Sequence, residues 1–367
     1  MYGLENSGIG RYIMNLVYEL KTLDISNNYV ILLREKYYKS LHFPGNWRKV
    51  LADFRHYTLT EQFNLPKIIN KEKPDLVHFP HFNVPFFYQG KFVVTVHDMT
   101  MHFQGRNATT LPTMSYLAKR IPYKIIFRNS VKKAVKIIAP SMTVRGEIKD
   151  YFKINRDKIA VTYEGLDSVY KSTLTPNLNI NSFELGNRYF VYTGNAYPHK
   201  NLENLIDATS YLNRHMGLSV NLVIIGSRTV FLEKLKFYIE KTGANNYVKL
   251  LGYIQDEYLK LIYRNSVAFV FPSLAEGFGL PGIEAMASGT LVLASDIPVF
   301  KEIYKDNVLY FNPHDYRSIA KTMKDVMKIK ESERKIIIQK SKIFIQRYSW
   351  RNMAKETLKI YESSNSI

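Results

Sequence analysis

The sequence predicts an α/β protein built from two doubly wound domains. A chain of 367 residues suits about two domains, and its 46% hydrophobic residues can fill two cores. Short apolar runs typical of buried parallel strands alternate with segments of helical periodicity. Glycine-containing loops follow several of these runs, as is usual in doubly wound sheets. A polar segment around residues 165–187 marks the expected boundary between the domains.

Composition excludes several classes of protein. The chain has no cysteine, which excludes disulfides, thiolate metal sites and cysteine nucleophiles and fits a cytoplasmic location. No run of roughly 18 uncharged apolar residues occurs, so we expect no membrane span, and no signal peptide is visible. The net charge of +19, much of it in residues 1–140, suits an anionic membrane or an anionic substrate, or simply reflects a lysine-rich proteome. No nucleic-acid-binding motif accompanies it, so we expect no nucleic-acid partner.

The chain opens on a glycine loop, Ser7-Gly8-Ile9-Gly10-Arg11, that precedes an apolar stripe at helical spacing. In a doubly wound domain such a loop follows the first strand, yet no strand precedes it here. We therefore expect the first N-terminal strand to be missing, because the chain begins internally at a misassigned Met or a truncation. A GxG before a helix is also often only a tight turn.

Several apolar runs in the first half predict strands, and two of them end in histidines. His78 and His81 close one run, and His97-Asp98 closes Lys91–Asp98, the clearest buried strand of this half. These side chains could face a ligand at the carboxyl edge of the sheet, or could be structural partners that cover the core. The expected strands are 28–33, 75–79, 91–98, 136–141 and 158–163, and the expected helices are 61–71, 116–136 and one that Ser141 caps.

Residues 116–136 predict a helix that is rich in both cations and apolar residues. The preceding residues, 99–113, show no period and predict a loop on the ligand side of the sheet. The helix could present a membrane-surface face, or it could carry an ordinary solvated face while its apolar residues supply the core. Both interpretations stay open. The cations are Lys119, Arg120, Lys124, Arg128, Lys132, Lys133 and Lys136.

The second half repeats the alternation of strand and helix more cleanly. Its first strand is followed by Gly194, and Lys200 lies at the start of the next helix. A glycine after a strand and a lysine at a helix start is a common way for a fold to bind a phosphate. The expected strands are 189–193, 220–225, 248–252, 267–271, 290–295 and 309–311, and further helices are expected from residue 314 or 315 and over 348–363.

Residues 267–296 are the most informative stretch of this half. A buried strand leads into a loop with Glu276 and then a helix with Glu284, which Pro281 starts and Gly289 ends. Glycines let the backbone approach a ligand, helix N–H groups suit an anion, and carboxylates accept hydrogen bonds from hydroxyls. The pair therefore suits a polyhydroxylated ligand that carries a phosphate. Alternatively, the two glutamates are a loop charge and a first-turn helix charge, which the macrodipole favours anyway.

The segment Glu276-Gly-Phe-Gly-Leu-Pro-Gly-Ile-Glu284 resembles the E-x7-E signature of glycosyltransferase family 4. These enzymes use nucleotide sugars, retain the anomeric configuration and have the GT-B fold, in which two Rossmann-like doubly wound domains face each other across a cleft. The resemblance covers almost the whole chain. It implies an acceptor-side domain over residues 1–170, a nucleotide-sugar-binding domain over 171–347, and a C-terminal helix, 348–367, that returns to the first domain.

The resemblance also implies roles for the residues that would bind the phosphates. Gly194 and Lys200 match the family's diphosphate-binding positions. Many members have arginine directly after this glycine, where this chain has Asn195. Arg228, which follows the strand at 220–225, is our candidate for the second cation. Gly8 and Gly10 would lie beside the donor phosphate or the acceptor.

The remaining roles concern the sugar, the ribose and the base. Glu276 would hold sugar hydroxyls, Glu284 would hold the ribose, and His97 would orient the transferred sugar from the first domain. The implied catalytic residues are thus His97, Lys200 and Glu276. Backbone groups would serve the rest of the donor: those of Gly277, Phe278, Gly279 and Leu280 for the sugar, and those of Tyr253 and Ile254 for the nucleobase.

The implied reaction moves a hexose from a GDP-, UDP- or dTDP-sugar to a hydroxyl of a glycan or lipid-linked acceptor. Mannose from GDP-mannose, in surface polysaccharide or glycolipid assembly, is the first choice because the chain resembles bacterial mannosyl- and rhamnosyltransferases. No metal or other cofactor is expected. The enzyme would be cytoplasmic and could contact an anionic membrane peripherally. Two alternatives remain: a GT-B protein that only binds nucleotide sugars or epimerises them, and a basic membrane-surface binding protein.

Overall fold

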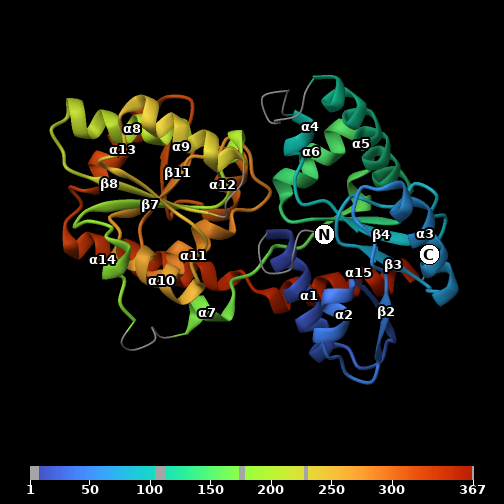
Figure 1. Ribbon diagram of the computed structural model, residues 1–367. Coiled ribbons are helices and arrows are strands. Elements are labelled where there is room, and N and C mark those ends of the chain that lie inside the picture. The colour runs from blue at the N-terminus through green and yellow to red at the C-terminus, as the bar shows by residue number, and fades with distance from the viewer. Residues whose placement is uncertain (1–7, 104–112, 173–177, 227–229, 366–367) are drawn as a thin grey trace. The chain divides into compact units, whose positions relative to one another are not determined.

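The computed structural model describes residues 8–103, 113–172, 178–226 and 230–365 (Figure 1). The chain forms two compact units. The N-terminal unit takes the chain up to His102, the segment that ends at Gly165 and the C-terminal stretch from Ser349. The C-terminal unit runs from Leu166 to Tyr348. No helix among the described residues is both long enough and apolar enough to cross a membrane.

The strands of the N-terminal unit are all parallel and form two sheets. One sheet pairs β1 (Tyr29–Leu33) with β2 (Trp47–Leu51). Among the described residues, no strand joins β1 to the second sheet. That sheet has the order β3 (Val77–Phe79), β4 (Phe92–Thr95), β5 (Lys136–Ala139) and β6 (Ile159–Val161).

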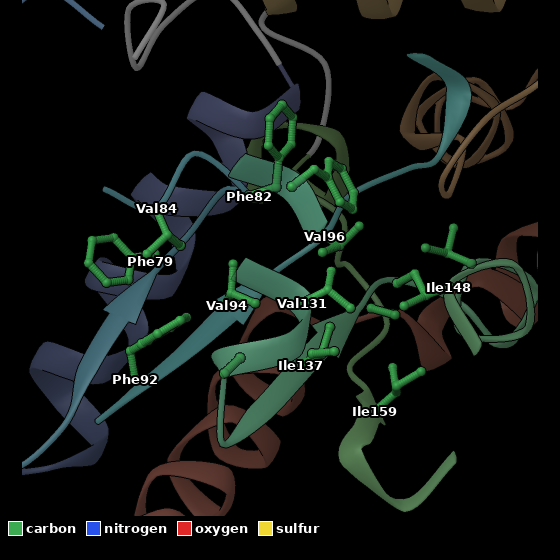
Figure 2. Close-up of a cluster of buried hydrophobic side chains, with 14 of the residues drawn as sticks. Phe79, Phe82, Val84, Phe92, Val94, Val96, Val131, Ile137, Ile148 and Ile159 are labelled. Carbon is green, nitrogen blue, oxygen red and sulfur yellow. The ribbon is translucent and has the colours of Figure 1, made fainter. Parts of the chain in front are cut away.

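Helices cover both faces of the four-stranded sheet, because successive strand residues point to opposite sides. On one face, Val94 packs with residues of three helices in the cluster that Figure 2 shows. On the other face, Val93 and Ile138 pack against Ile360. The first set of helices is α3 (Leu59–Glu72), α5 (Thr113–Lys133) and α6 (Met142–Phe152); α1 (Gly8–Leu23) contacts α15 (Trp350–Asn365), and the short α2 (Glu35–Ser40) and α4 (Thr100–Phe103) complete the unit.

In its described residues, the C-terminal unit forms one parallel sheet of six strands with helices between them. Most of the buried residues of its strands are apolar, as is usual in parallel sheets covered on both faces. The strand order is β12 (Leu309–Phe311), β11 (Val292–Ser295), β10 (Ala268–Phe271), β7 (Tyr189–Thr193), β8 (Asn221–Ile225) and β9 (Val248–Leu251). The helices are α7 (Ser168–Lys171), α8 (Leu202–His215), α9 (Val230–Thr242), α10 (Asp256–Asn265), α11 (Leu280–Ser288), α12 (Pro298–Tyr304), α13 (Tyr316–Val326) and α14 (Glu331–Phe344).

Two of the expected helix ends are confirmed by their geometry. Ser141 caps α6, since its hydroxyl accepts a hydrogen bond from the Val144 N–H at 3.2 Å. Gly289 ends α11 with φ +87°, a left-handed conformation that glycine adopts at little cost.

Two expected loops are wrong. Residues 8–10 were expected as a loop, but α1 already begins at Gly8, and Gly10 is buried in its first turn. The buried face of the helix is formed by Tyr12, Leu16 and Leu20, which recur every four residues. The expected loop at 99–113 instead opens with α4, and residues 104–112 lie outside the described part of the chain.

Candidate active site

The strand order of the C-terminal unit predicts where its ligand lies. β8 and β9 follow β7 to one side, whereas β10, β11 and β12 lie on its other side. The chain therefore leaves β7 and β10 in opposite directions, and open parallel sheets bind their ligands at the carboxyl ends of the strands at such a switch point. The loop after β7 carries Lys200, and the loop after β10 carries Glu276.

Lys200 and Glu276 form an ion pair at this switch point. The Lys200 Nζ lies 2.5 Å from Glu276 Oε1, and both side chains are largely buried. Ser273 donates its hydroxyl to the same carboxylate oxygen at 2.7 Å. Lys200 and Ser273 both donate to one oxygen and so fix the Glu276 carboxylate. The carboxylate in turn holds Lys200 near the helix start, where the sequence predicts a phosphate.

Backbone contacts join the two loops behind the ion pair. The Leu274 N–H donates to the His199 carbonyl at 2.8 Å. Asn201 has φ +59°, and its side-chain amide donates to the carbonyls of Pro272 at 3.1 Å and Pro313 at 2.7 Å. Asn201 therefore holds the loops after β7, β10 and β12 together.

Glycine is required where the loops after β7 and β8 meet. Gly194 has φ +143°, and a Cβ atom there would lie 2.7 Å from the Tyr192 hydroxyl oxygen. A Cβ atom on Gly226 would lie 2.1 Å from the Gly194 carbonyl oxygen. We did not predict Gly226 as part of the site, although a glycine directly after the apolar run of β8 was an available signal.

Tyr304 supports the start of α11 through a buried hydrogen bond. Its buried hydroxyl donates to the Gly279 carbonyl at 2.6 Å. A Cβ atom on Gly279 or on Gly282 would lie 2.3 Å from the same hydroxyl oxygen. Gly279 is the N-cap of α11, with φ +108° and no side chain to accept a hydrogen bond from the first turn. This end of α11 can therefore turn N–H groups toward a ligand.

Buried tyrosines and a neutral histidine surround the charges of this site. Burial first, and then the carboxylates of Glu276 and Glu284, raise the pKa of Tyr304. Burial and the neighbouring Lys200 ammonium lower the pKa of His199 to about 3, so this imidazole is neutral at physiological pH. Glu284 is itself buried in α11. In the described residues of these loops, Lys200 supplies the positive charge. The carboxylates of the site are those of Glu276 in the loop after β10 and Glu284 in α11.

His97 lies in the other unit, at the carboxyl end of β4. Its Nε2 donates to the Pro80 carbonyl at 2.9 Å, because a carbonyl oxygen can only accept. Its Nδ1 lies 3.6 Å from a carboxylate oxygen of Glu164, and its ring packs edge-on against Tyr12 at 4.8 Å between centroids. Both ring nitrogens therefore face partners within the N-terminal unit. Glu164 follows β6, and sequence reasoning did not identify it as a partner of His97.

Comparison with known proteins identifies the family of the chain. Residues 6–169 match the family described as Glycosyltransferase Family 4, and residues 176–343 match Glycosyl transferases group 1. The O-antigen chain mannosyltransferase RfbU of Salmonella typhimurium is 30% identical over 278 residues, which are 76% of this chain and 70% of that protein. The chain belongs to glycosyltransferase family 4. The O-antigen chain mannosyltransferase B of Escherichia coli is 26% identical over 97% of this chain and 96% of its own.

Solved structures place this glycosyltransferase in the GT-B fold. The Anabaena protein Alr3699/HepE in complex with UDP-glucose matches with a TM-score of 0.75 at 17% identity, over 98% of this chain and 97% of that one. The sucrose-phosphate synthase of Thermosynechococcus elongatus matches with a TM-score of 0.74 at 17% identity, over 97% and 93% of the two chains. At this identity the likeness supports the fold alone, and it confirms the fold expected from the sequence.

The remaining predicted site residues of the glycosyltransferase are distributed as follows. Tyr253 and Ile254 follow β9, with the Tyr253 side chain exposed. Phe278 is buried against Tyr348, which leaves only its backbone for a ligand. Asn195 accepts a hydrogen bond from Tyr192 through its carbonyl at 2.9 Å. Gly277 lies two residues before the α11 N-cap, and Leu280 lies directly after it. Gly8 and Gly10 lie in α1, and Arg228 lies outside the described residues.

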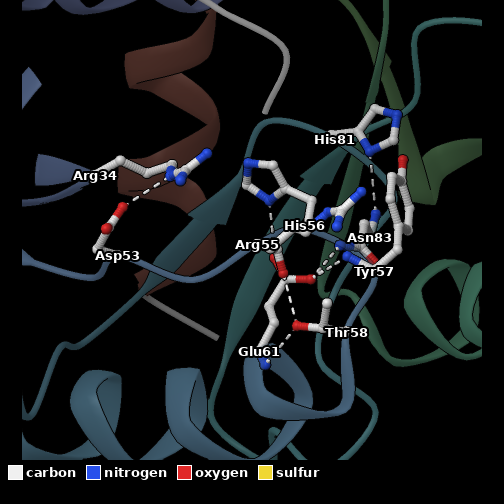
Figure 3. Close-up of polar contacts among 9 residues, drawn as sticks. All are labelled: Arg34, Asp53, Arg55, His56, Tyr57, Thr58, Glu61, His81 and Asn83. Atoms are coloured by element: carbon white, nitrogen blue, oxygen red, sulfur yellow. Dashed lines mark hydrogen bonds and ion pairs between the residues drawn. The ribbon is translucent and has the colours of Figure 1, made fainter. Parts of the chain in front are cut away.

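Figure 3 shows a second polar cluster, in the loops that follow β2 and β3 of the N-terminal unit. The Glu61 carboxylate accepts from the Tyr57 N–H at 2.8 Å and from the Asn83 amide at 3.0 Å, and the His56 ring lies 3.0 Å away. Thr58 caps α3 by accepting from the Glu61 N–H. The spacing Thr58-x-x-Glu61 is that of a capping box, a signal that sequence reasoning missed. Glu61 therefore organises these loops.

Proposed function

We propose that this glycosyltransferase transfers mannose from GDP-mannose to a hydroxyl of a glycan or lipid-linked acceptor, with retention of the anomeric configuration. The observation that carries the proposal is the contact between Lys200 and Glu276 at the switch point of the C-terminal sheet. A cation for phosphates and a carboxylate for hydroxyls lie side by side there. The mannosyltransferases of Salmonella typhimurium and Escherichia coli support mannose as the sugar and O-antigen assembly as the pathway.

Without a donor, the two charges of the ion pair neutralise each other. Donor phosphates would compete with Glu276 for the Lys200 ammonium, which Glu276 holds at the switch point of the sheet. Glu276, released from the lysine but still bound by Ser273, would then accept hydrogen bonds from the sugar hydroxyls. Glu284 would accept hydrogen bonds from the ribose. Binding of the donor thus replaces the contact between Lys200 and Glu276 by two contacts with the donor, one from Lys200 to the phosphates and one from Glu276 to the sugar.

The chemical step needs a stabilised leaving group more than it needs a base. The bond between the anomeric carbon and the diphosphate oxygen breaks, and the acceptor oxygen bonds to that carbon from the same face. The acceptor proton goes to the departing diphosphate, so the reaction balances with GDP as the second product. Lys200 and the N–H groups at the start of α11 would stabilise the charge that develops on the diphosphate. His97, whose ring Glu164 and the Pro80 carbonyl hold in place, would orient the sugar by packing against it.

In this proposal the first domain, residues 1–170, takes the acceptor, and the second, residues 171–347, takes the donor. The enzyme works from the cytoplasm, at the inner face of a membrane that carries its acceptor. It requires no metal or other cofactor.

A ligand panel and one variant test the proposal. GDP-mannose should raise the thermal midpoint of the protein more than UDP-glucose or dTDP-rhamnose, because a ligand that binds only the folded state stabilises it by mass action. Glu276→Gln should lose most mannosyl transfer, whereas Glu331→Gln, on the exposed first turn of α14, should transfer normally. Stabilisation by another nucleotide sugar alone would overturn the donor. Donor turnover without an acceptor product would favour the epimerase alternative.

A further inference from the structure

The outward face of α5 exposes large apolar side chains that a soluble surface normally avoids. Met114, Leu117, Ile121 and Ile125 are 79%, 50%, 63% and 50% exposed. Their spacing of three or four residues places them on one side of the helix. They form a continuous strip about three turns long, which we name the α5 stripe.

The α5 stripe is not needed for the core. The opposite side of α5 supplies Phe127 and Val131, both fully buried in the cluster against the sheet. The helix is therefore apolar on two sides, one packed and one exposed. Among the described residues of the N-terminal unit, none covers the stripe enough to bury it. Contiguous exposed apolar surface of this kind marks an interaction site.

Cations surround the stripe, and carboxylates are absent from α5. The helix carries lysines and arginines from Lys119 to Lys133 and no Asp or Glu. Among the residues that the structure describes, Lys119, Lys124 and Arg128 form no ion pair. Unneutralised cations beside an apolar strip suit a partner that is apolar within and anionic at its surface.

A basic hollow lies on the neighbouring helix. α5 and α6 share one core cluster, where Phe127 stacks on Phe152 at 5.5 Å between centroids, and Figure 1 shows both helices in the same layer of the unit. A hollow of about 230 Å³ is lined by Arg145, Lys149 and Arg156, with Met142 and Gly146. Lys149 pairs with Asp150 at 3.4 Å, whereas Arg145 and Arg156 form no ion pair with any described residue. Guanidinium groups around a hollow suit a phosphate.

We propose that α5 and α6 of the N-terminal unit dock this enzyme on an anionic lipid bilayer. The α5 stripe enters the boundary between headgroups and acyl chains, the α5 cations pair with lipid phosphates, and the α6 hollow receives one further phosphate. The bilayer is favoured over a protein partner because the stripe is one helix wide and the charge around it is of one sign, within a chain of net charge +19. This deepens the proposed function, on which it rests only for the location of the acceptor.

Vesicle flotation of the full-length protein tests the docking surface. We expect binding to vesicles that contain phosphatidylglycerol, weaker binding to phosphatidylcholine alone, and loss of the difference at high salt. Each cation near the surface contributes roughly fivefold to binding, so Lys124→Glu/Arg128→Glu should weaken it at least tenfold. Ile121→Asp/Ile125→Asp should weaken it similarly, and Arg145→Ala/Arg156→Ala should reduce the preference for anionic lipid.

Helix α14 in the C-terminal unit offers matched controls. Ile336 and Ile343 are 57% and 59% exposed there, and Lys335 and Lys340 are also exposed. Ile336→Asp/Ile343→Asp and Lys335→Glu/Lys340→Glu should therefore leave flotation unchanged. Circular dichroism of every variant verifies that it is folded.

Three results would overturn the proposal: no binding by the native protein, equal binding to neutral vesicles, or equal loss in the α14 controls. A dimer in ultracentrifugation that the α5 variants dissolve would assign the face to a second copy instead. Transfer of mannose to a soluble glycan acceptor is measured in parallel. The α5 variants should keep that transfer, so loss of docking and failure of the proposed reaction are separate outcomes.

Discussion

The carboxyl ends of the strands carry different chemistry in the two units. In the C-terminal unit they bring together Lys200 and Glu276 as a largely buried ion pair, with Glu284 buried in the adjoining helix. In the N-terminal unit they bring together imidazoles that burial keeps neutral. Burial and the neighbouring His97 lower the pKa of His78 and of His81 to about 3. Burial and nearby cations lower the pKa of His102 to about 4.

In the proposed reaction this contrast corresponds to a division between donor binding and acceptor binding. A phosphate needs a fixed cation, and Lys200 is held in place before any donor arrives. The hydroxyl that receives the sugar carries no charge, so neutral hydrogen-bonding groups suit it. A buried charge without a partner would cost desolvation free energy there. The neutral imidazoles lower the free energy of unfolding at acid pH, because the unfolded protein takes up protons there that the folded protein does not. The comparison can therefore be tested through activity in one unit and through stability in the other.

The largest effect should come from Lys200→Ala. In the proposed reaction Lys200 stabilises the departing diphosphate, so its removal should lower kcat by about 100-fold or more. Lys328→Ala, which breaks an exposed pair with Asp325 on α13, serves as the matched control and should leave kcat unchanged. Thermal unfolding followed by circular dichroism separates loss of catalysis from loss of fold. Normal turnover by the folded Lys200→Ala protein would show that the ion pair is merely structural.

The second effect is acid destabilisation of the N-terminal unit. The folded pKa of His78 is depressed, so its contribution to stability is present above pH 6.5 and is lost as the pH falls toward 3. Between pH 6.5 and pH 5 each such imidazole should cost roughly 2 kcal/mol of unfolding free energy. The N-terminal unit has His78, His81 and His102, whereas the C-terminal unit has His199.

Hydrogen exchange at pH 7 and pH 5 measures this difference unit by unit. Peptides from β3, β4 and β5 should lose protection at pH 5 before peptides from β7, β8 and β10. His78→Gln should make the stability of the N-terminal unit less dependent on pH. His314→Gln, at an exposed position, should not change that dependence. Equal loss of protection in both units would remove the contrast.

The third effect concerns the rigid support of α11. A methyl group at Gly282 would meet the Tyr304 hydroxyl, which is buried and held by the Gly279 carbonyl. Gly282→Ala should therefore cost about 1–3 kcal/mol of stability, as overpacked cores do. Gly146→Ala on α6 is the matched control, since nothing lies within 4 Å of its added Cβ. Alanine favours a helix over glycine, so the control should be neutral or more stable. Equal midpoints for both variants would mean that Tyr304 moves freely.

The sequence allowed prediction of what depends on near neighbours. The strands of both units follow from short apolar runs, and Gly289 at the end of α11 follows from the residue itself. Tyr304 is different, because its role depends on a contact with Gly279, which is 25 positions away. Asn201 likewise acts through Pro313, and Glu164 through His97. Such contacts exist only once the chain is folded, so no local pattern shows them.

The α5 helix illustrates a further limit of sequence patterns. Its periodicity could not distinguish a packed face from an exposed one, because both sides carry large apolar residues. Ile121 and Phe127 differ little in type, yet one is largely exposed and the other fully buried. Only packing against β4, β5 and α6 decides between them. For that reason the two interpretations of residues 116–136 could be weighed only with the fold in hand.

The smallest effect extends the preference for neutral groups to a carboxyl of the N-terminal unit. Burial, and then the neighbouring Asp98, raise the pKa of Glu147 to about 7. A raised folded pKa contributes stability that is complete below the unfolded value of 4.5 and is lost as the pH rises through 7. Glu147→Gln mimics the neutral acid and should therefore match the native protein near pH 5. Above pH 7 it should be more stable by about 1 kcal/mol, since partial exposure reduces the full effect. If the melting temperatures of the two proteins change in parallel from pH 5 to pH 8, Glu147 ionises as freely as a surface residue. The groups that burial keeps neutral in the N-terminal unit would then be its imidazoles and not this carboxyl.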